Sequence, residues 1–216
     1  MSDQGKEDKT PGTWSSTPHE PEGIAKNTEV EQQQAGTNND FIKEYEALRV
    51  ALGLTTPIIS YPACGDDISL SRVFPQSDTY YIDPDIAALE AIKAAGLQEE
   101  TTHLVAQSAY NYKSPQPVDL VVLRNASTDN DDTVGLTRGL KKGGYVIESH
   151  WGSTVRSRDL LADPNFALVG RFALDKDMEG KVVLNTNTNE IAKKLAEDTG
   201  VISQYAGRGY VFQKKS

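Results

Sequence analysis

The chain has 216 residues, a length that predicts one folded domain with an appendage. Its formal net charge of −9 at neutral pH disfavours non-specific binding to nucleic acid or anionic lipid, because their phosphates are repelled. It contains no apolar run of about 18 residues and no basic N-terminus followed by an apolar stretch, so we expect a cytoplasmic protein without a membrane span or a secretory signal. Cys64 is the single cysteine, which excludes an intramolecular disulfide and a multi-cysteine metal site.

Residues 1–38 are predicted to be a disordered acidic tail. This segment is rich in Pro, Gly, Ser, Thr, Gln and Glu, and its apolar residues Trp14, Ile24 and Val30 follow no period. Such a composition buries too little apolar surface to offset the entropy of ordering. The tail is interpreted as a solubilising segment or, alternatively, as a partner-binding arm anchored by Trp14.

Residues 39–216 are predicted to form the folded domain, which begins with a helix. Asn39 and Asp40 can cap its start, and Gly53 suits the position just past its end. The apolar residues between them repeat at helical spacing: Phe41, Tyr45, Leu48 and Leu52. We expect this helix to cover one edge of a sheet.

Strands and helices alternate through the rest of the domain. Apolar runs bounded by turn residues predict strands at 57–61, 79–82, 103–106, 118–123, 145–148, 167–174 and 209–213. Helices are predicted at 70–74, 85–95, 131–140, 155–161 and 191–197. In helix 85–95, Ile86, Leu89 and Ile92 are expected to face inward. This alternation predicts an α/β fold with βαβ units and a mostly parallel sheet.

Four local sequences, in this order, resemble the class I S-adenosylmethionine-dependent methyltransferases. They are the strand and turn at 58–67, the acid Asp83 after the second strand, the strand at 119–125, and Leu-Lys-Lys-Gly-Gly-Tyr-Val-Ile at 140–147, which is similar to the family's Leu-Lys-Pro-Gly-Gly turn. The resemblance implies a Rossmann-like three-layer sandwich whose seven-stranded sheet is mostly parallel with an antiparallel last strand. It also implies S-adenosyl-L-methionine as the cofactor.

The glycine-rich turn of that family is degenerate in this chain. Glycines at such a turn let the backbone approach a cofactor closely. Gly65 keeps one of the three glycine positions, Ala63 and Asp67 occupy the other two, and Tyr61 stands where an acid often lies. The resemblance therefore implies cofactor binding at Ala63, Gly65 and Asp67. Asp tolerates a left-handed backbone, although its side chain would narrow the cleft.

Two further positions complete the implied cofactor site. A carboxylate at Asp83 can accept hydrogen bonds from ribose hydroxyls, with Asp85 as the alternative if the register shifts. Asp83 before Pro84 is also the pattern of a plain helix N-cap. Past the third strand, Ser108 and Gln107 take the place where the family contacts adenine, although an ordinary loop fits these residues as well.

Asn125 and His150 are the catalytic candidates, because they follow the fourth and fifth predicted strands. Asn125 lies where the family positions methyl acceptors, and it is also a common turn former. His150 would be a general base beside the indole of Trp151, or the two side chains pack a loop. Cys64 precedes a helix, whose positive end lowers a thiol pKa, or it is a small buried residue. No metal-ligand spacing occurs.

The leading hypothesis for function is a methyltransferase of unknown acceptor. The alternative is a catalytically inactive scaffold that kept the fold and lost the cofactor, serving as a binding or interaction protein. A nicotinamide-dependent oxidoreductase ranks third, because Gly-x-Gly-x-x-Gly does not follow the first strand. The first two hypotheses differ over the space above Gly65, which is open in an enzyme and filled by Asp67 or Tyr61 in a scaffold. Nothing in the sequence indicates the oligomeric state.

Overall fold

The computed structural model describes residues 41–124, 133–149, 157–173, 182–184 and 208–216. The predicted tail at 1–38 and the predicted helix at 191–197 lie outside these residues, as do Asn125, His150 and Trp151. Within the described ranges, no helix is long and apolar enough to cross a bilayer.

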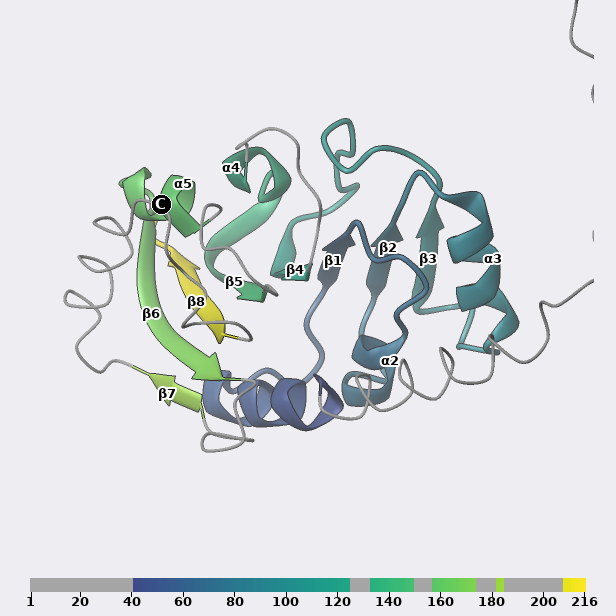
Figure 1. The fold of residues 1–216 in the computed structure, drawn as a ribbon, viewed down its shortest axis with the longest axis horizontal. Coiled ribbons are helices and arrows are strands. Elements are labelled where there is room, and N and C mark those ends of the chain that lie inside the picture. Colours follow the sequence, from purple (N-terminus) through teal and green to yellow (C-terminus); the bar gives the residue numbers. More distant parts are fainter. Residues whose placement is uncertain (1–40, 125–132, 150–156, 174–181, 185–207) are drawn as a thin grey trace, which may run out of the picture. The chain divides into compact units, whose positions relative to one another are not determined.

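The described helices and strands follow one another in the predicted order, with one strand added (Figure 1). A helix of residues 41–52 comes first. It is followed by β1 (Ile59–Pro62), α2 (Ser69–Val73), β2 (Thr79–Ile82), α3 (Ile86–Ala94), β3 (Thr102–Val105), β4 (Val118–Arg124), α4 (Thr133–Leu136), β5 (Leu140–Ser149), α5 (Ser157–Ala162), β6 (Phe166–Ala173), β7 (Val182–Leu184) and β8 (Arg208–Lys214).

The strands form one sheet in the order β3-β2-β1-β4-β5-β8-β6-β7. Neighbours from β3 to β5 pair in parallel, whereas β8 runs antiparallel to both β5 and β6. The predicted mostly parallel sheet with an antiparallel last strand is therefore confirmed. One strand was missed: β7 adds a short antiparallel edge beside β6, and its three residues are too few to give a periodic signal.

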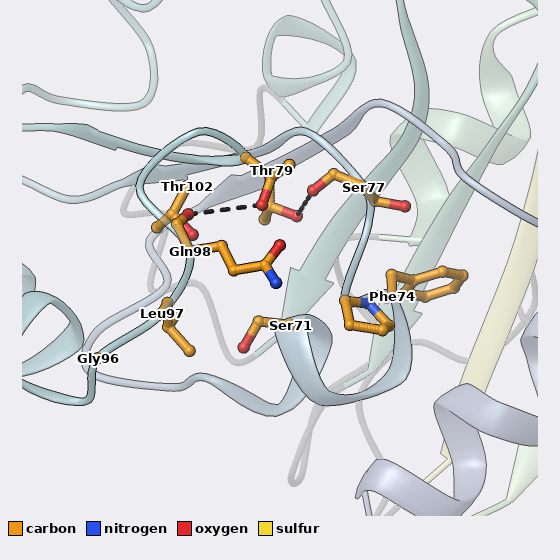
Figure 2. A pocket seen from close by; sticks show the side chains of 10 residues that line it. Ser71, Phe74, Ser77, Thr79, Gly96, Leu97, Gln98 and Thr102 are labelled. Atoms are coloured by element: carbon orange, nitrogen blue, oxygen red, sulfur yellow. Dashed lines mark hydrogen bonds between the residues drawn. The ribbon is translucent and has the colours of Figure 1, made fainter.

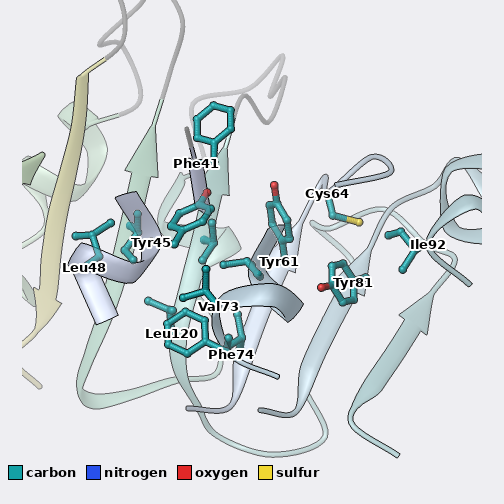
Figure 3. Close-up of a cluster of buried hydrophobic side chains, with 14 of the residues drawn as sticks. Phe41, Tyr45, Leu48, Tyr61, Cys64, Val73, Phe74, Tyr81, Ile92 and Leu120 are labelled. Carbon is teal, nitrogen blue, oxygen red and sulfur yellow. The ribbon is translucent and has the colours of Figure 1, made fainter. Parts of the chain in front are cut away.

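The sheet separates two apolar clusters, which confirms the three-layer arrangement. On one face, strand residues such as Ile59 and Leu120 pack with helix 41–52, α2 and α3 (Figure 3). On the other face, Val121 and Val146 pack with Leu136 of α4 and Leu160 of α5. Strand β4 is buried along most of its length, as expected for a central parallel strand with helices on both sides.

Helix 41–52 ends where the sequence predicts. Gly53 has φ +65°, its amide donates to the Val50 carbonyl at 3.2 Å, and the Leu54 amide donates to the Arg49 carbonyl at 3.0 Å. These two bonds form a Schellman motif, which glycine permits at no steric cost. Phe41, Tyr45 and Leu48 are buried, so the predicted apolar stripe faces the core.

Two predictions about local structure were wrong. Ile86, the first residue of α3, is 64% exposed, whereas Leu89 and Ile92, further along the helix, are buried as expected. The predicted helix 131–140 and the turn after it also differ from the structure. Leu140 already belongs to β5 and pairs with Val118, whereas Leu120 pairs with Tyr145, so residues 141–144 bulge out of the register.

Candidate functional site

The candidate site lies where the strand order reverses, at the carboxyl ends of β1, β2 and β4. Open α/β sheets bind ligands at this switch point. The turn after β1 holds two left-handed residues, Ala63 with φ +53° and Gly65 with φ +56°. A Cβ atom built on Gly65 meets nothing within 4 Å. The backbone at Gly65 therefore borders open space.

Asp83 joins this turn to the end of β2. Its Oδ2 accepts a hydrogen bond from the Gly65 amide at 2.9 Å, and its Oδ1 accepts one from the Asp85 amide at 2.9 Å. The side chain of Asp85, which accepts a bond from Ala87 N at 2.9 Å, is the N-cap of α3. Asp83 is therefore not the plain N-cap that the sequence allowed. It is a carboxylate fixed beside Gly65 by two backbone amides.

Asp67 turns away from solvent into a buried polar cluster, defined here as Tyr61, Asp67, Ser69 and Arg124. The Tyr61 hydroxyl donates to Asp67 Oδ2 at 2.7 Å, and the Ser69 amide donates to Oδ1 at 3.0 Å. The Ser69 hydroxyl also donates to Oδ1, and Arg124 forms an ion pair with Oδ2. With four donors, this carboxylate is tied to β1, to α2 and to β4.

Arg124 is a member of the site that the sequence did not identify. It is the last residue of β4, and its side chain is 11% exposed. The guanidinium carbon lies 3.2 Å from the ring centroid of Phe41, which places helix 41–52 over the carboxyl end of β4. The signal available in the sequence was a cation directly after the four apolar residues 120–123, because a charge buried at the end of such a strand requires a partner.

The cluster accounts for two departures from the family's turn. Burial, followed by the nearby Asp67 charge, raises the pKa of Tyr61 well above its usual value. The phenol therefore stays neutral and donates to Asp67. Tyr61 stands at the end of β1, where the resemblance implies an acid, and Asp67 supplies a carboxylate six residues later. Both side chains are buried, while the space beside Gly65 stays open.

Ala63 is the position where we predict a gain in stability. A left-handed conformation disfavours any residue with a Cβ atom by about 1–2 kcal/mol, and Ala63 has φ +53°. Ala63→Gly is expected to raise the free energy of unfolding by about 0.5–1 kcal/mol after the greater entropy of the unfolded glycine is included. Urea denaturation measures the change. Ala91→Gly, in the exposed part of α3, is the opposite control and should lose about 1 kcal/mol.

Cys64 does not have the properties of a nucleophile. Its side chain is buried at 5% exposure, and this burial, followed by the nearby Asp83 charge, raises the thiol pKa. We expect iodoacetamide at pH 8 to leave the folded protein unmodified and to alkylate it rapidly in urea, because the thiolate is the reactive form. Mass spectrometry reads the modification. Rapid alkylation of the folded chain would contradict the assignment of Cys64 as a packing residue.

The loop after β3 forms a local turn. The Gln107 amide donates to the Val105 carbonyl at 3.0 Å, and the Asn111 amide donates to the Ser108 carbonyl at 3.0 Å. Ser108 is half-buried, and its role toward adenine stays a prediction. Asn125 and His150 lie outside the described residues, so their catalytic roles also stay predictions. Among the residues that the structure describes, no three His, Cys, Asp or Glu side chains gather as metal ligands.

No protein-family model matches the sequence, and no curated protein does. Solved structures do match. The plantazolicin methyltransferase BpumL in complex with SAH superposes with a TM-score of 0.58 at 11% identity, over 90% of this chain and 92% of that one. The N-methyltransferase NodS from Bradyrhizobium japonicum WM9 gives 0.52 at 10% identity, over 80% and 94%. A SAM-dependent methyltransferase from Thiobacillus denitrificans, in complex with S-adenosyl-L-homocysteine, gives 0.50 at 13% identity, over 78% and 89%. At these identities the likeness establishes a common fold.

Proposed function

We propose that this chain, which has the class I S-adenosylmethionine-dependent methyltransferase fold, binds S-adenosyl-L-methionine and transfers its methyl group to an acceptor. The observation that carries the proposal is the Asp83 carboxylate, held by two backbone amides beside the open space at Gly65. A fold hosts many functions, so the site has to support the chemistry. The solved relatives crystallised with SAH add to this support.

The residues at the switch point fit the cofactor. The open space above the Gly65 backbone allows a ligand to approach it closely. Each carboxylate oxygen of Asp83 accepts one backbone bond and keeps a second acceptor site for a ribose hydroxyl. Ala63 and Gly65 would form the turn beneath the nucleoside, with Ser108 toward adenine. When bound, the cofactor supplies a methyl group already activated on a sulfonium centre.

The protein's own contribution is positioning. In-line transfer from a sulfonium requires the two reacting atoms to be held close and aligned, and such orientation lowers the barrier without a universal acid or base. Arg124 neutralises the Asp67 carboxylate at the same edge of the sheet. Asp83, directly after β2, is then a carboxylate anchored by two backbone amides, those of Gly65 and Asp85. Asn125 and His150 are proposed to line the acceptor side.

Isothermal titration of the full chain with S-adenosylmethionine and S-adenosylhomocysteine tests the proposal. We expect micromolar binding, weakened by about 10–100-fold in Asp83→Ala, because hydrogen bonds to a charged group contribute about 1.5–3 kcal/mol. Asp85→Ala removes the neighbouring N-cap of α3 and is expected to bind like the unaltered chain. Equal weakening in both variants would assign the effect to a loosened helix end and not to a lost ribose contact.

The buried polar cluster favours a second candidate, a scaffold without catalytic activity. Asp67 occupies a glycine position of the family's turn, and its four hydrogen bonds tie the turn to β1, α2 and β4. A turn held in this way serves stability as well as it serves a ligand. Absence of heat and of thermal stabilisation at millimolar cofactor would support the scaffold, and protein partners would then be sought.

We also infer a cytoplasmic location and a domain boundary near residue 39. The lone thiol supports the location, because free thiols are typical of a reducing compartment. The change from a polar, aperiodic composition to helical periodicity supports the boundary. Limited proteolysis followed by mass spectrometry tests the boundary, with cleavage expected before residue 39.

A further inference from the structure

The turn after β1 is anchored at two points. The Gly65 amide donates to Asp83 Oδ2 at 2.9 Å, which bonds the turn to the end of β2. Two residues later, the Asp67 amide donates to the Cys64 carbonyl at 3.3 Å, which closes residues 64–67 into a β-turn. Gly65, whose backbone borders open space, therefore lies between the two anchors.

Position 67 does not require a glycine. Among the described non-glycine residues, only Ala63 has a positive φ, so the backbone of Asp67 avoids the left-handed region that favours glycine. The Asp67 side chain is buried in the polar cluster, while the space beside Gly65 stays open. The side chain at this position can therefore order the turn without occupying the place of a ligand.

The donors to the Asp67 carboxylate come from three elements around the turn. They are the Tyr61 hydroxyl of β1 at 2.7 Å, the Ser69 amide of α2 at 3.0 Å, and the Arg124 guanidinium of β4. Side chains fixed by several hydrogen bonds hold a neighbouring binding site in one geometry. Loss of the carboxylate would free one anchor of the turn, and the other anchor is the bond made by Gly65 itself.

We propose that Asp67 is a positioning residue for the cofactor. It orders the turn so that the Gly65 backbone and the Asp83 carboxylate keep the arrangement that receives S-adenosyl-L-methionine. This inference rests on the proposed function. A turn ordered in advance lowers the entropic cost of binding. The resemblance implies a glycine at position 67, and restoring that glycine is expected to impair the site and not to repair it.

Isothermal titration of the full chain with S-adenosylhomocysteine compares Asp67→Gly with Asp67→Asn. Both substitutions remove the charge that pairs with Arg124, but Asn keeps a side-chain oxygen for the Ser69 amide. Asp67→Gly is expected to bind at least tenfold more weakly than the unaltered chain, because the turn must then be ordered on binding, and Asp67→Asn to stay within about threefold of it. Equal affinities of the two variants would overturn the proposal.

Tyr61→Phe tests the same point if Asp67→Gly does not fold. It removes one hydrogen bond to Asp67 and leaves the ion pair with Arg124 in place. Cofactor binding is expected to weaken by about threefold or more. Tyr81→Phe is the matched control, because its ring centroid lies 6.0 Å from that of Tyr61 and its hydroxyl makes no hydrogen bond to Asp67. The proposal is contradicted if these two variants bind the cofactor equally well.

Amide hydrogen exchange without cofactor measures the order of the turn directly. The Gly65 amide is expected to exchange at least threefold faster in Tyr61→Phe than in Tyr81→Phe, because one anchor of the turn is weakened. The Thr79 amide is the internal reference. It donates to the Thr101 carbonyl at 2.8 Å at the amino end of β2, beside the hollow that these two residues help to line (Figure 2). Its exchange rate is expected to be similar in the two variants.

The two measurements distinguish failure of this inference from failure of the proposed function. If the unaltered chain binds neither S-adenosylmethionine nor S-adenosylhomocysteine, the proposed function fails and the positioning role fails with it. If the unaltered chain binds the cofactor, but Gly65 exchanges at the same rate in Tyr61→Phe and Tyr81→Phe, the positioning role alone is overturned.

Discussion

Arg124→Met is expected to lower the free energy of unfolding by about 3–5 kcal/mol. The substitution removes the cation that pairs with Asp67, whose side chain is 10% exposed, and leaves a buried carboxylate without a countercharge. It also removes the guanidinium from the face of the Phe41 ring, which loosens helix 41–52. Urea unfolding followed by circular dichroism measures the loss, with an unchanged m-value expected for a two-state domain.

A double-mutant cycle identifies the origin of that loss. Asp67→Asn keeps the shape of the side chain and removes its charge. Combined with Arg124→Met, it is expected to recover at least half of the stability lost by Arg124→Met alone, because the buried charge is then gone. If the two single substitutions changed the free energy of unfolding additively, Asp67 and Arg124 would not interact as an ion pair that holds the turn against β4.

Gly144→Ala is expected to destabilise the fold by about 1–3 kcal/mol through overpacking. A Cβ atom at Gly144 would lie 2.7 Å from Leu140 Cδ1 and 2.9 Å from each of the Asp119 and Lys141 carbonyl oxygens. Two of these three neighbours are backbone atoms, which cannot rotate away. The bulge at the start of β5 therefore has to widen. Thermal unfolding by calorimetry measures the effect.

Gly143 provides the matched control in the same bulge. It has φ +77°, and a Cβ atom there meets nothing within 4 Å. Gly143→Asn is expected to change the free energy of unfolding by less than about 1 kcal/mol, because Asn tolerates the left-handed region. If Gly143→Asn destabilised the chain more than Gly144→Ala, backbone conformation and not close packing would govern this bulge.

Apolar runs in the sequence predicted most strands of the sheet. Strand 79–82 was predicted with the bounds that the structure has, and 118–123 differs from β4 by one residue. Strand 118–123 contributes to apolar clusters on both faces of the sheet, and 79–82 is buried throughout, so most positions carry the hydrophobic signal. Ile86 illustrates the limit of the same reasoning. Helical spacing placed it inward, yet it is 64% exposed, because periodicity predicts which face of a helix is apolar but not how far along the helix that face is covered.

The sequence identified only part of the candidate site. Gly65 and Asp83 were identified, and the structure joins them through one hydrogen bond of 2.9 Å. The partner of Asp67 was not identified, because Arg124 lies 57 residues further along the chain. The order of apolar runs and turns by itself determined the α/β fold, since burial is a local property of each segment. Only the tertiary structure decided which charges meet at the switch point, because crossover connections bring the ends of distant parallel strands to the same edge of the sheet.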